Sequence, residues 1–261
     1  MFGRLRSILD VVPNYIVDYQ EHSKSFPEKR WIDRVTTDFT WSGNIYDFYR
    51  RVILKLTVDL KIPFQIINNE RMDDSLVHQA LREALVNTLI HADYTGRLSI
   101  LIIKHTDLFE FRNPGIFRIS KEDAIRGGYS DCRNRTMQKM FQLIGLGEQA
   151  GSGIPKIYSG WSSQHWKAPI YKELIEKNQI TLQLPTTSLL PEDDVNWVKD
   201  RLSDEIFDDL TKTELIALTT AKTENSITHQ RLSELTGEHP ADLTKILHGL
   251  LEKHLLLSVC N

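Results

Sequence analysis

The segment from Ser75 to about His91 places the strongest constraint on the fold of this chain. Its apolar residues recur at helical spacing and include Val77, Leu81, Leu85 and Leu89. This period predicts an amphipathic helix that begins at Asp74 or Ser75 and packs its apolar stripe against a core. Glu83 and Asn87 stand four residues apart, and His91 follows after four more, so the three side chains share one face of that helix.

The pair Glu83 and Asn87 can support two kinds of chemistry. A carboxylate can take a proton from a water molecule that is aimed at a phosphoryl group. A carboxamide oxygen can ligate Mg²⁺, a hard cation that prefers oxygen ligands. An isolated Glu-x-x-x-Asn pair is nevertheless common on the solvated face of a helix, so the spacing does not by itself assign either role.

Two glycine-containing motifs follow this helix along the chain. Asn113-Pro114-Gly115 comes directly after an apolar strand pattern at 108–111, and glycine there allows the backbone to approach a planar ring or a phosphate closely. Gly151-Ser152-Gly153 precedes a helical pattern, where backbone N–H groups can hold an anion. Each motif taken alone also fits an ordinary tight turn. The chain contains no Gly-x-x-x-x-Gly-Lys-[Ser/Thr] phosphate-binding loop.

The order of these motifs resembles that of the GHKL ATPases, the class that includes gyrase, MutL and the histidine kinases. The resemblance is carried by Glu83-x-x-x-Asn87, Asn113-x-Gly115, Gly151-x-Gly153 and Thr181 on the last strand pattern. A longer set of motifs is similar to the C-terminal ATPase-like domain of bacterial Schlafen/AlbA-type, RecG-related transcriptional regulators. The set comprises the run from Arg82 to Tyr94, Asn113-Pro114-Gly115, Arg133-Asn134 and Gly151-Ser152-Gly153-Ile154. The resemblance covers about residues 1–185. It implies an α/β fold, an α+β sandwich of the GHKL or Bergerat type.

The resemblance also implies a role for each motif residue. Glu83 would be the general base of a weak ATPase, and Asn87 would ligate Mg²⁺. Asn113 would face the adenine of ATP, and Gly115 would leave room for the base. The phosphates would lie against Gly151, Ser152 and Gly153. The remaining residues expected to contact the nucleotide are His91, Arg133 and Thr181, of which Arg133 would reach a phosphate and Thr181 would lie near the base.

One motif departs from the family pattern. Gyrase-type sites have Asp where this chain has Asn113. An amide oxygen can still accept a hydrogen bond from the adenine amino group, but it lacks the charge, so a lower affinity for ATP is expected. The implied lid over the nucleotide runs from about Gly127 to Gly147. Family members usually carry an upstream AlbA/Schlafen domain, so the chain is expected to be either a fragment or a naturally short form.

Composition and pattern divide the chain into four parts. Residues 1–70 are predicted to be an N-terminal α/β segment that leads into the ATPase-like domain, which occupies residues 71–185. Residues 186–210 contain a proline and an acidic run and are typical of a linker. Residues 211–261 show three short helical patterns with a tight Thr236-Gly237 turn, which predicts a winged helix-turn-helix whose wing is cut short.

The C-terminal helices offer a candidate surface for double-stranded DNA within residues 228–257. Its candidate contacts, on the third helical pattern, are Thr244, Lys245 and His248. From Glu205 to the end there are five Lys or Arg residues and nine Asp or Glu residues, a balance that disfavours contacts with phosphates. A small helical interaction or dimerisation module is therefore an equal alternative. The histidines of this region match no zinc spacing.

The remaining features of the sequence concern the setting of the protein. A formal net charge of −3 gives no strong overall field toward nucleic acid. Two distant cysteines, with no signal peptide and no apolar run of the ~18 residues that span a bilayer, indicate a cytoplasmic protein away from membranes. We therefore predict a regulatory protein that binds ATP and Mg²⁺ and is coupled to a helix-turn-helix tail, as a transcriptional regulator or a defence-related protein. A homodimer is a candidate assembly. The alternative is a DNA-binding transcription factor whose ATPase-like domain is a non-catalytic scaffold or homodimerisation module. Helicase activity is not indicated.

Overall fold

The computed structural model describes residues 1–24, 30–58, 60, 65–67, 70–72, 75–147, 151–164 and 166–257. The chain divides into two compact units. The first consists of Met1–Gln164 and Pro169–Thr186, and the second of His165–Ala168 and Thr187–Asn261. The alternative helix cap at Asp74 lies outside the described residues.

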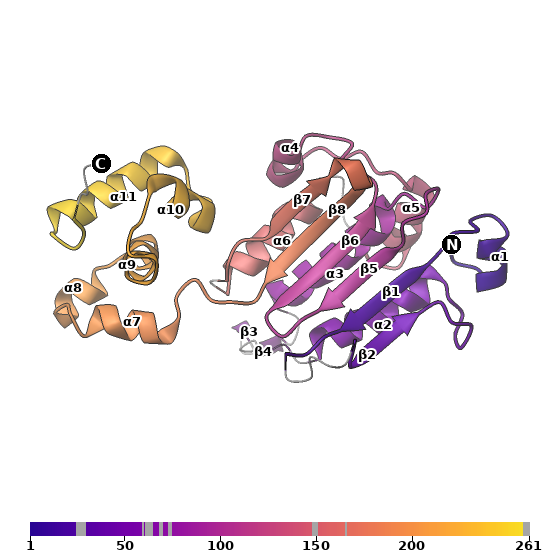
Figure 1. Ribbon diagram of the computed structural model, residues 1–261, viewed down its shortest axis with the longest axis horizontal. Coiled ribbons are helices and arrows are strands. Elements are labelled where there is room, and N and C mark those ends of the chain that lie inside the picture. The colour runs from indigo at the N-terminus through magenta and orange to yellow at the C-terminus, as the bar shows by residue number, and fades with distance from the viewer. Residues whose placement is uncertain are drawn as a thin grey trace. The chain divides into compact units, whose positions relative to one another are not determined.

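The first unit is built on a six-stranded sheet (Figure 1). Its strands are β1 (Val17–Glu21), β2 (Asp33–Thr36), β5 (Ile100–Lys104), β6 (Leu108–Pro114), β7 (Ile170–Leu174) and β8 (Gln179–Pro185). They are ordered β2-β1-β5-β6-β8-β7, with β1 parallel to β5 and every other pair antiparallel. A separate pair joins β3 (Gln65–Ile67) to β4 (Glu70–Met72). Together with the helices, this sheet confirms the predicted mixed α/β fold class.

Helices α2, α3 and α6 cover one face of this sheet (Figure 1). The helices of the unit are α1 (Leu5–Leu9), α2 (Ile45–Thr57), α3 (Leu76–His91), α4 (Lys121–Arg126), α5 (Arg135–Leu143) and α6 (Gly153–Ser162). Three of them begin at a side chain that accepts a hydrogen bond from a backbone N–H of the first turn: Asn44, Ser75 and Ser120. These caps satisfy amides that the helices leave unpaired, and they fix where each helix starts.

Helix α3 forms the centre of the core. Leu81, Leu85 and Leu89 are fully buried on it, as their spacing predicts. Gly160 of α6 lies so close to α3 that a Cβ there would come within 2.6 Å of the Leu76 carbonyl oxygen. The missing side chain therefore lets the two helices pack tightly, and this places the beginning of α6 beside the polar residues of α3.

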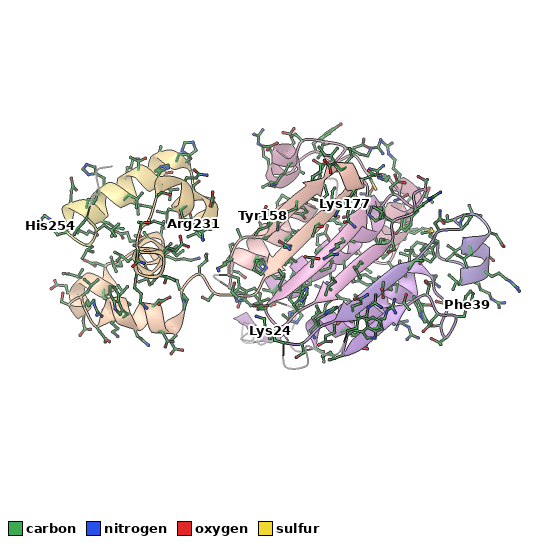
Figure 2. The ribbon with its side chains drawn as sticks, viewed as in Figure 1. Lys24, Phe39, Tyr158, Lys177, Arg231 and His254 are labelled. Atoms are coloured by element: carbon green, nitrogen blue, oxygen red, sulfur yellow. The ribbon has the colours of Figure 1, made fainter. Side chains whose placement is uncertain are left out.

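Alternate residues of the strands face opposite sides of the sheet. Phe111 pairs with Leu182 in the register, and both are buried beneath the helices. On the other face, Arg34 donates two hydrogen bonds of 2.9 Å to the carboxylate of Asp18. At the exposed turn after β2, Phe39 adopts a left-handed backbone with φ of 64° (Figure 2). The hydrogen bonds of Arg34 with Asp18 therefore stabilise the face of the sheet that carries no helices.

The second unit is helical. Its helices are α7 (Glu192–Lys199), α8 (Asp204–Asp208), α9 (Lys212–Glu224), α10 (His229–Thr236) and α11 (Pro240–Glu252). Residues 186–210 thus contain two helices where a linker is expected. Val198 of α7 is buried in one cluster with Ile216, Leu232 and Leu250. The proline and the acidic run suggested a solvated segment, but Pro191 and the three acidic residues after it form the start of α7, where both are favourable.

The connection between α10 and α11 is short and well defined. Gly237 ends α10 in the left-handed conformation, and Pro240 occupies the first turn of α11. Helix α9 starts with a capping box between Thr211 and Glu214. Arg231 of α10, marked in Figure 2, pairs with Glu224 at 2.7 Å. The helix, turn and helix are therefore present; a wing, and with it a winged-helix identity, stays a prediction.

Membrane spans and metal clusters are both absent from the residues that the structure describes. None of the helices in that part of the chain has both the length and the apolarity required to traverse a bilayer. Within the same residues, no three His, Cys, Asp or Glu side chains gather as a metal cluster. A Mg²⁺ ion held by one amide oxygen and by phosphates needs no such cluster.

Candidate functional site

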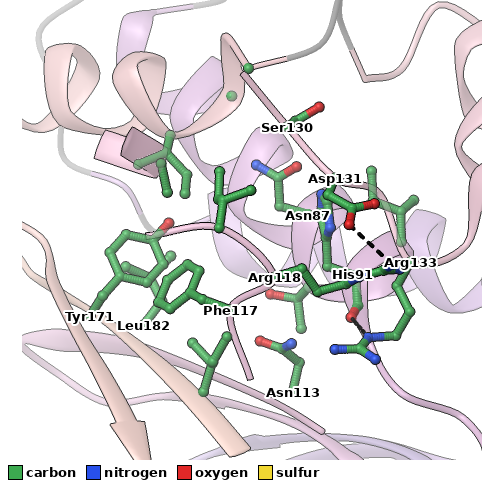
Figure 3. A pocket seen from close by; sticks show the side chains of 18 of the residues that line it. Asn87, His91, Asn113, Phe117, Arg118, Ser130, Asp131, Arg133, Tyr171 and Leu182 are labelled. Carbon is green, nitrogen blue, oxygen red and sulfur yellow. Dashed lines mark hydrogen bonds and ion pairs between the residues drawn. The ribbon is translucent and has the colours of Figure 1, made fainter. Parts of the chain in front are cut away.

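A cavity of about 130 Å³ lies in the first unit, between α3, the edge of the sheet and the loops that follow β6 (Figure 3). Seven of the ten sequence-predicted contacts with the nucleotide line it. They are Glu83, Asn87, His91, Asn113, Arg133, Gly151 and Gly153. Gly115, Ser152 and Thr181 do not. The cavity therefore joins residues that lie far apart in the sequence, and the position of Arg133 and the alternation along β8 account for two of the exceptions, Gly115 and Thr181.

Helix α3 supplies the polar wall of the cavity. Glu83 is only 9% exposed, although it is a carboxylate. Asn87, one turn later, points into the cavity (Figure 3), and its carboxamide has no hydrogen-bond partner among the residues that the structure describes. A half-buried amide without a partner is available to a ligand, because its donor and acceptor groups are already partly withdrawn from water.

The beginning of α6 meets this wall directly. A Cβ at Gly153 would lie 2.5 Å from Glu83 Oε1 and 2.6 Å from Asn87 Nδ2. Ser152 is the N-cap residue of α6, but its side chain makes no capping hydrogen bond. The first turn of α6 is therefore not capped by this side chain, and such a helix start favours an anion.

A glycine-rich contact closes the cavity beside α6. The Gly128 N–H donates a 3.1 Å hydrogen bond to the Gly151 carbonyl oxygen. A Cβ at Gly127 would lie 2.6 Å from the same oxygen, and Gly151 has φ of 84°, so two of these positions require glycine. The segment that follows contributes Tyr129, Ser130 and Asp131 to the lining. Part of the segment expected to form a lid thus covers the cavity.

Apolar side chains of the sheet form another part of the cavity wall. Ile180 and Leu182 of β8 line it beside Tyr171 of β7, and the rings of Phe117 and Tyr171 lie 5.7 Å apart (Figure 3). Burial raises the pKa of Tyr171, so its hydroxyl stays protonated. Together these residues make a slot that suits a flat, apolar group.

Asn113 is the polar group in this part of the wall, near the end of β6. Its side chain is 8% exposed. The Nδ2 atom lies 3.5 Å from the carbonyl oxygen of its neighbour Pro114, which is the limit of a hydrogen bond. The amide is therefore free to exchange this weak contact for a better one with a ligand that both donates and accepts hydrogen bonds.

Arg133 ties two walls of the cavity together. Its Nε donates to the His91 carbonyl oxygen at 3.1 Å, and its Nη2 donates to the Ile116 carbonyl oxygen at 3.1 Å. Gly115, with φ of 102°, faces this guanidinium, and a Cβ there would come within 3.0 Å of Nη2. The space at Gly115 is therefore occupied by Arg133 and is not open to a base. Two of the arginine's groups are already engaged by carbonyl oxygens.

His91 is a neutral group in this wall. Burial, together with the positive charge of Arg133, lowers its pKa to about 4. Beside it, Arg118 pairs with Asp131 at 3.0 Å (Figure 3). The imidazole therefore remains uncharged at neutral pH and can only offer one donor and one acceptor to a ligand.

Thr181 lies on the wrong side of β8 for the expected role. It pairs with Arg112 in the register, on the sheet face opposite the helices, whereas its neighbours Ile180 and Leu182 line the cavity. Side chains of a strand alternate between faces, so a one-residue difference in assignment exchanges the two sets. The run Ile180-Thr181-Leu182-Gln183-Leu184 already shows this alternation, and it identifies the apolar positions as those that face the helices.

The candidate DNA contacts of α11 are engaged within the second unit. The Thr244 hydroxyl donates to the Pro240 carbonyl oxygen at 3.0 Å. Lys245 lies 3.6 Å from Asp242, and His248 lies 3.3 Å from Glu252. From residue 187 to residue 261 the chain has seven Lys or Arg residues and fourteen Asp or Glu residues. The surface charge of this unit therefore does not favour a polyanion.

Comparisons with known proteins place this geometry in a family context. Residues 99–182 match the family model described as "Putative ATP-dependent DNA helicase recG C-terminal". The match supports a RecG-related, ATPase-like domain in this chain. It starts just before β5 and ends in β8, so it contains Asn113 and the glycine motifs but not Glu83 or Asn87. No curated protein matches the chain by sequence.

A solved structure shares the fold. The DIP2311 protein from Corynebacterium diphtheriae superposes with a TM-score of 0.53 at 16% sequence identity. The likeness covers 89% of this chain and 46% of the other, so this chain spans about half the length of that protein. At this identity the comparison concerns the fold and carries no activity over.

Proposed function

We propose that the first unit binds ATP together with Mg²⁺ in the cavity beneath α3. The observation that carries the proposal is the contact of Glu83 and Asn87 with Gly153 at the start of α6. A carboxylate, an amide and the backbone N–H groups at the start of α6 then surround one point, which is a suitable set for a metal-bound phosphate. The ATPase-like family match over residues 99–182 supports the same reading.

Charge repulsion at the start of α6, where the phosphates would bind, explains why Mg²⁺ is required. The Glu83 carboxylate lies close to the start of α6, which would hold a phosphate. Two negative groups at this distance repel each other, and the repulsion is strong because Glu83 is almost buried. When bound, Mg²⁺ would be held by the oxygen of Asn87 and would offset this repulsion. Binding of ATP is therefore coupled to Mg²⁺.

The base end receives the adenine. The slot of Phe117, Tyr171, Ile180 and Leu182 matches a flat aromatic ring. Asn113 supplies a hydrogen-bond acceptor for an exocyclic amino group and a donor for a ring nitrogen. Because neither Asn113 nor neutral His91 carries a charge, the recognition energy at this end is small, and a modest affinity follows.

Hydrolysis is a separate and narrower proposal. Glu83 is the carboxylate nearest the start of α6, so it is the group placed to take a proton from water beside a bound phosphate. In the described part of the cavity, the other lining carboxylate, Asp131, is paired with Arg118. The proposed turnover is slow, because Arg133 and Arg118 are both held by protein groups.

Isothermal titration with Mg-ATP tests the binding proposal. We expect a saturable heat at submillimolar to millimolar ligand that disappears in Asn87→Ala. The matched control is Asn178→Ala, because Asn178 is outside the cavity lining. Absence of heat with the unmodified chain, together with no protection by nucleotide against thermal unfolding, would reject the proposal.

We further propose a regulatory role in which nucleotide binding acts through the helical second unit. One observation favours a regulatory role that includes DNA binding. The short α10–Gly237–α11 connection has the order of elements found in a helix-turn-helix. The test is a gel shift with double-stranded promoter DNA, repeated on residues 1–186. Unchanged DNA binding after removal of the second unit would leave that unit as an interaction or dimerisation module, consistent with its negative charge.

A further inference from the structure

A second groove, of about 710 Å³, lies next to the cavity on the outside of α5. The residues that line it come from the N-terminus, the loop before α5 and the first turns of α5. They are Met1, Phe2, Arg118, Asp131, Cys132, Arg133, Asn134, Arg135, Thr136, Met137 and Met140. Arg118, Asp131 and Arg133 line both spaces. The groove is thus separated from the nucleotide cavity by one layer of charged side chains.

The groove carries an excess of positive charge. Three guanidinium groups, of Arg118, Arg133 and Arg135, face one carboxylate, that of Asp131. Asp131 pairs with Arg118 at 3.0 Å. Arg133 is held by two carbonyl oxygens, which orient it, and its charge also acts on the carboxylate of Asp93. Arg135 is exposed and has no partner among the described residues. The lining therefore has an excess of positive charge, and Arg135 is its least compensated group.

The remaining walls add backbone donors and an apolar floor. Asn134 precedes α5, but its Nδ2 donates to the carbonyl oxygens of Ile90 and Ala92 at 2.9 and 2.8 Å. The first turn of α5 consequently has no side-chain cap. Phe2 and Met137 provide apolar surface, and the Phe2 ring is fixed against Phe141 at 5.5 Å. Charge on one side and apolar surface on the other suit an organic anion better than a simple ion.

We propose that this groove is a second ligand site, which binds the phosphate group of an aromatic or apolar phosphate ester. The phosphate contacts Arg135 and Arg133, whose planar donors match its oxygens. The organic part of the ester lies on Phe2 and Met137. Neither Asn87 nor Asn113 lines this groove, so variants of those residues separate it from the first cavity, although Arg118, Asp131 and Arg133 line both spaces.

The experiment uses the full nucleotide-free chain and phenyl phosphate as the probe, at constant ionic strength. We expect saturable binding by isothermal titration, and a weaker affinity for inorganic phosphate, which lacks the ring. Benzoate separates phosphate recognition from recognition of any aromatic anion. Arg135→Gln should lower the affinity for phenyl phosphate about tenfold, and Arg135→Glu should lower it more. Both variants are expected to fold, because Arg135 is exposed.

The matched control is Lys139→Gln, which removes the same charge from the same helix one turn away and does not line the groove. Its affinity should stay within about twofold of the unmodified chain, since exposed charges are screened. Equal losses in the Arg135 and Lys139 variants would show general charge attraction and overturn the proposal. So would equal affinities for phenyl phosphate and benzoate, or the loss of phenyl phosphate binding in Asn87→Ala, which would place the probe in the nucleotide cavity.

Discussion

Gly153 lies so close to Glu83 that a Cβ on Gly153 would come within 2.5 Å of the Glu83 carboxylate oxygen Oε1. Real Cβ atoms do not approach other atoms this closely, so the two positions constrain each other. Glu83 belongs to α3 and Gly153 begins α6. The contact therefore sets both the polar lining of the cavity and the packing of the two helices around it.

Gly153→Ala should weaken binding of Mg-ATP and lower the free energy of unfolding by about 1–3 kcal/mol, because the methyl group must displace Glu83 or Asn87. Titration calorimetry and urea unfolding measure the two effects. Gly96→Ala is the control, since nothing lies within 4 Å of a Cβ at Gly96. Wild-type affinity in Gly153→Ala would show that ATP does not use this end of the cavity.

Glu83→Gln should retain ATP binding and lose hydrolysis, because the amide fills the same space but cannot accept a proton. The substitution also removes the negative charge that opposes a phosphate. The loss of affinity caused by EDTA should therefore be smaller in this variant than in the unmodified chain. Phosphate release and titrations with and without Mg²⁺ provide the measurements. Equal turnover in both proteins would remove Glu83 from the role of general base.

His91 should make the first unit sensitive to acid. Its pKa is about 4 in the folded chain and about 6.5 when unfolded. The folded state thus binds fewer protons between these values, so stability falls as the pH drops through this window. From pH 7 to pH 5 the loss assignable to His91 is about 2 kcal/mol. In His91→Gln, the free energy of unfolding measured with urea should not show this loss between pH 7 and pH 5. An identical pH dependence in the variant and the unmodified chain would contradict the prediction.

Arg133→Met should destabilise the first unit by about 2–4 kcal/mol, because the carbonyl oxygens of His91 and Ile116 each lose a charged donor. The control is Arg126→Met, since the Arg126 side chain is 80% exposed and lies 3.8 Å from Asp123. Thermal unfolding of the two variants gives the comparison. If Arg133→Met were as stable as its control but bound ATP more weakly, Arg133 would be a ligand contact and not a tie between walls.

Local pattern was sufficient for most of the secondary structure. The cap at Ser75 and the apolar spacing of α3 can be read from the sequence, because each depends on neighbours within one helical turn. The error at residues 186–210 has the same origin. A proline and acidic residues fit either a solvated linker or the first turn of a helix, and only the burial of Val198 in a distant cluster distinguishes them.

The sequence by itself determined that Glu83, Asn87 and His91 share one face of α3, because helical spacing alone fixes that relation. It also contained, in the alternation along β8, the information that Ile180 and Leu182 face the core. Only the tertiary structure decided that Gly153 touches Glu83 and that Arg133 fills the space beside Gly115. Those contacts depend on how α6 packs on α3 and how the loop before α5 folds back, and no local period encodes the distance between segments joined by long connections.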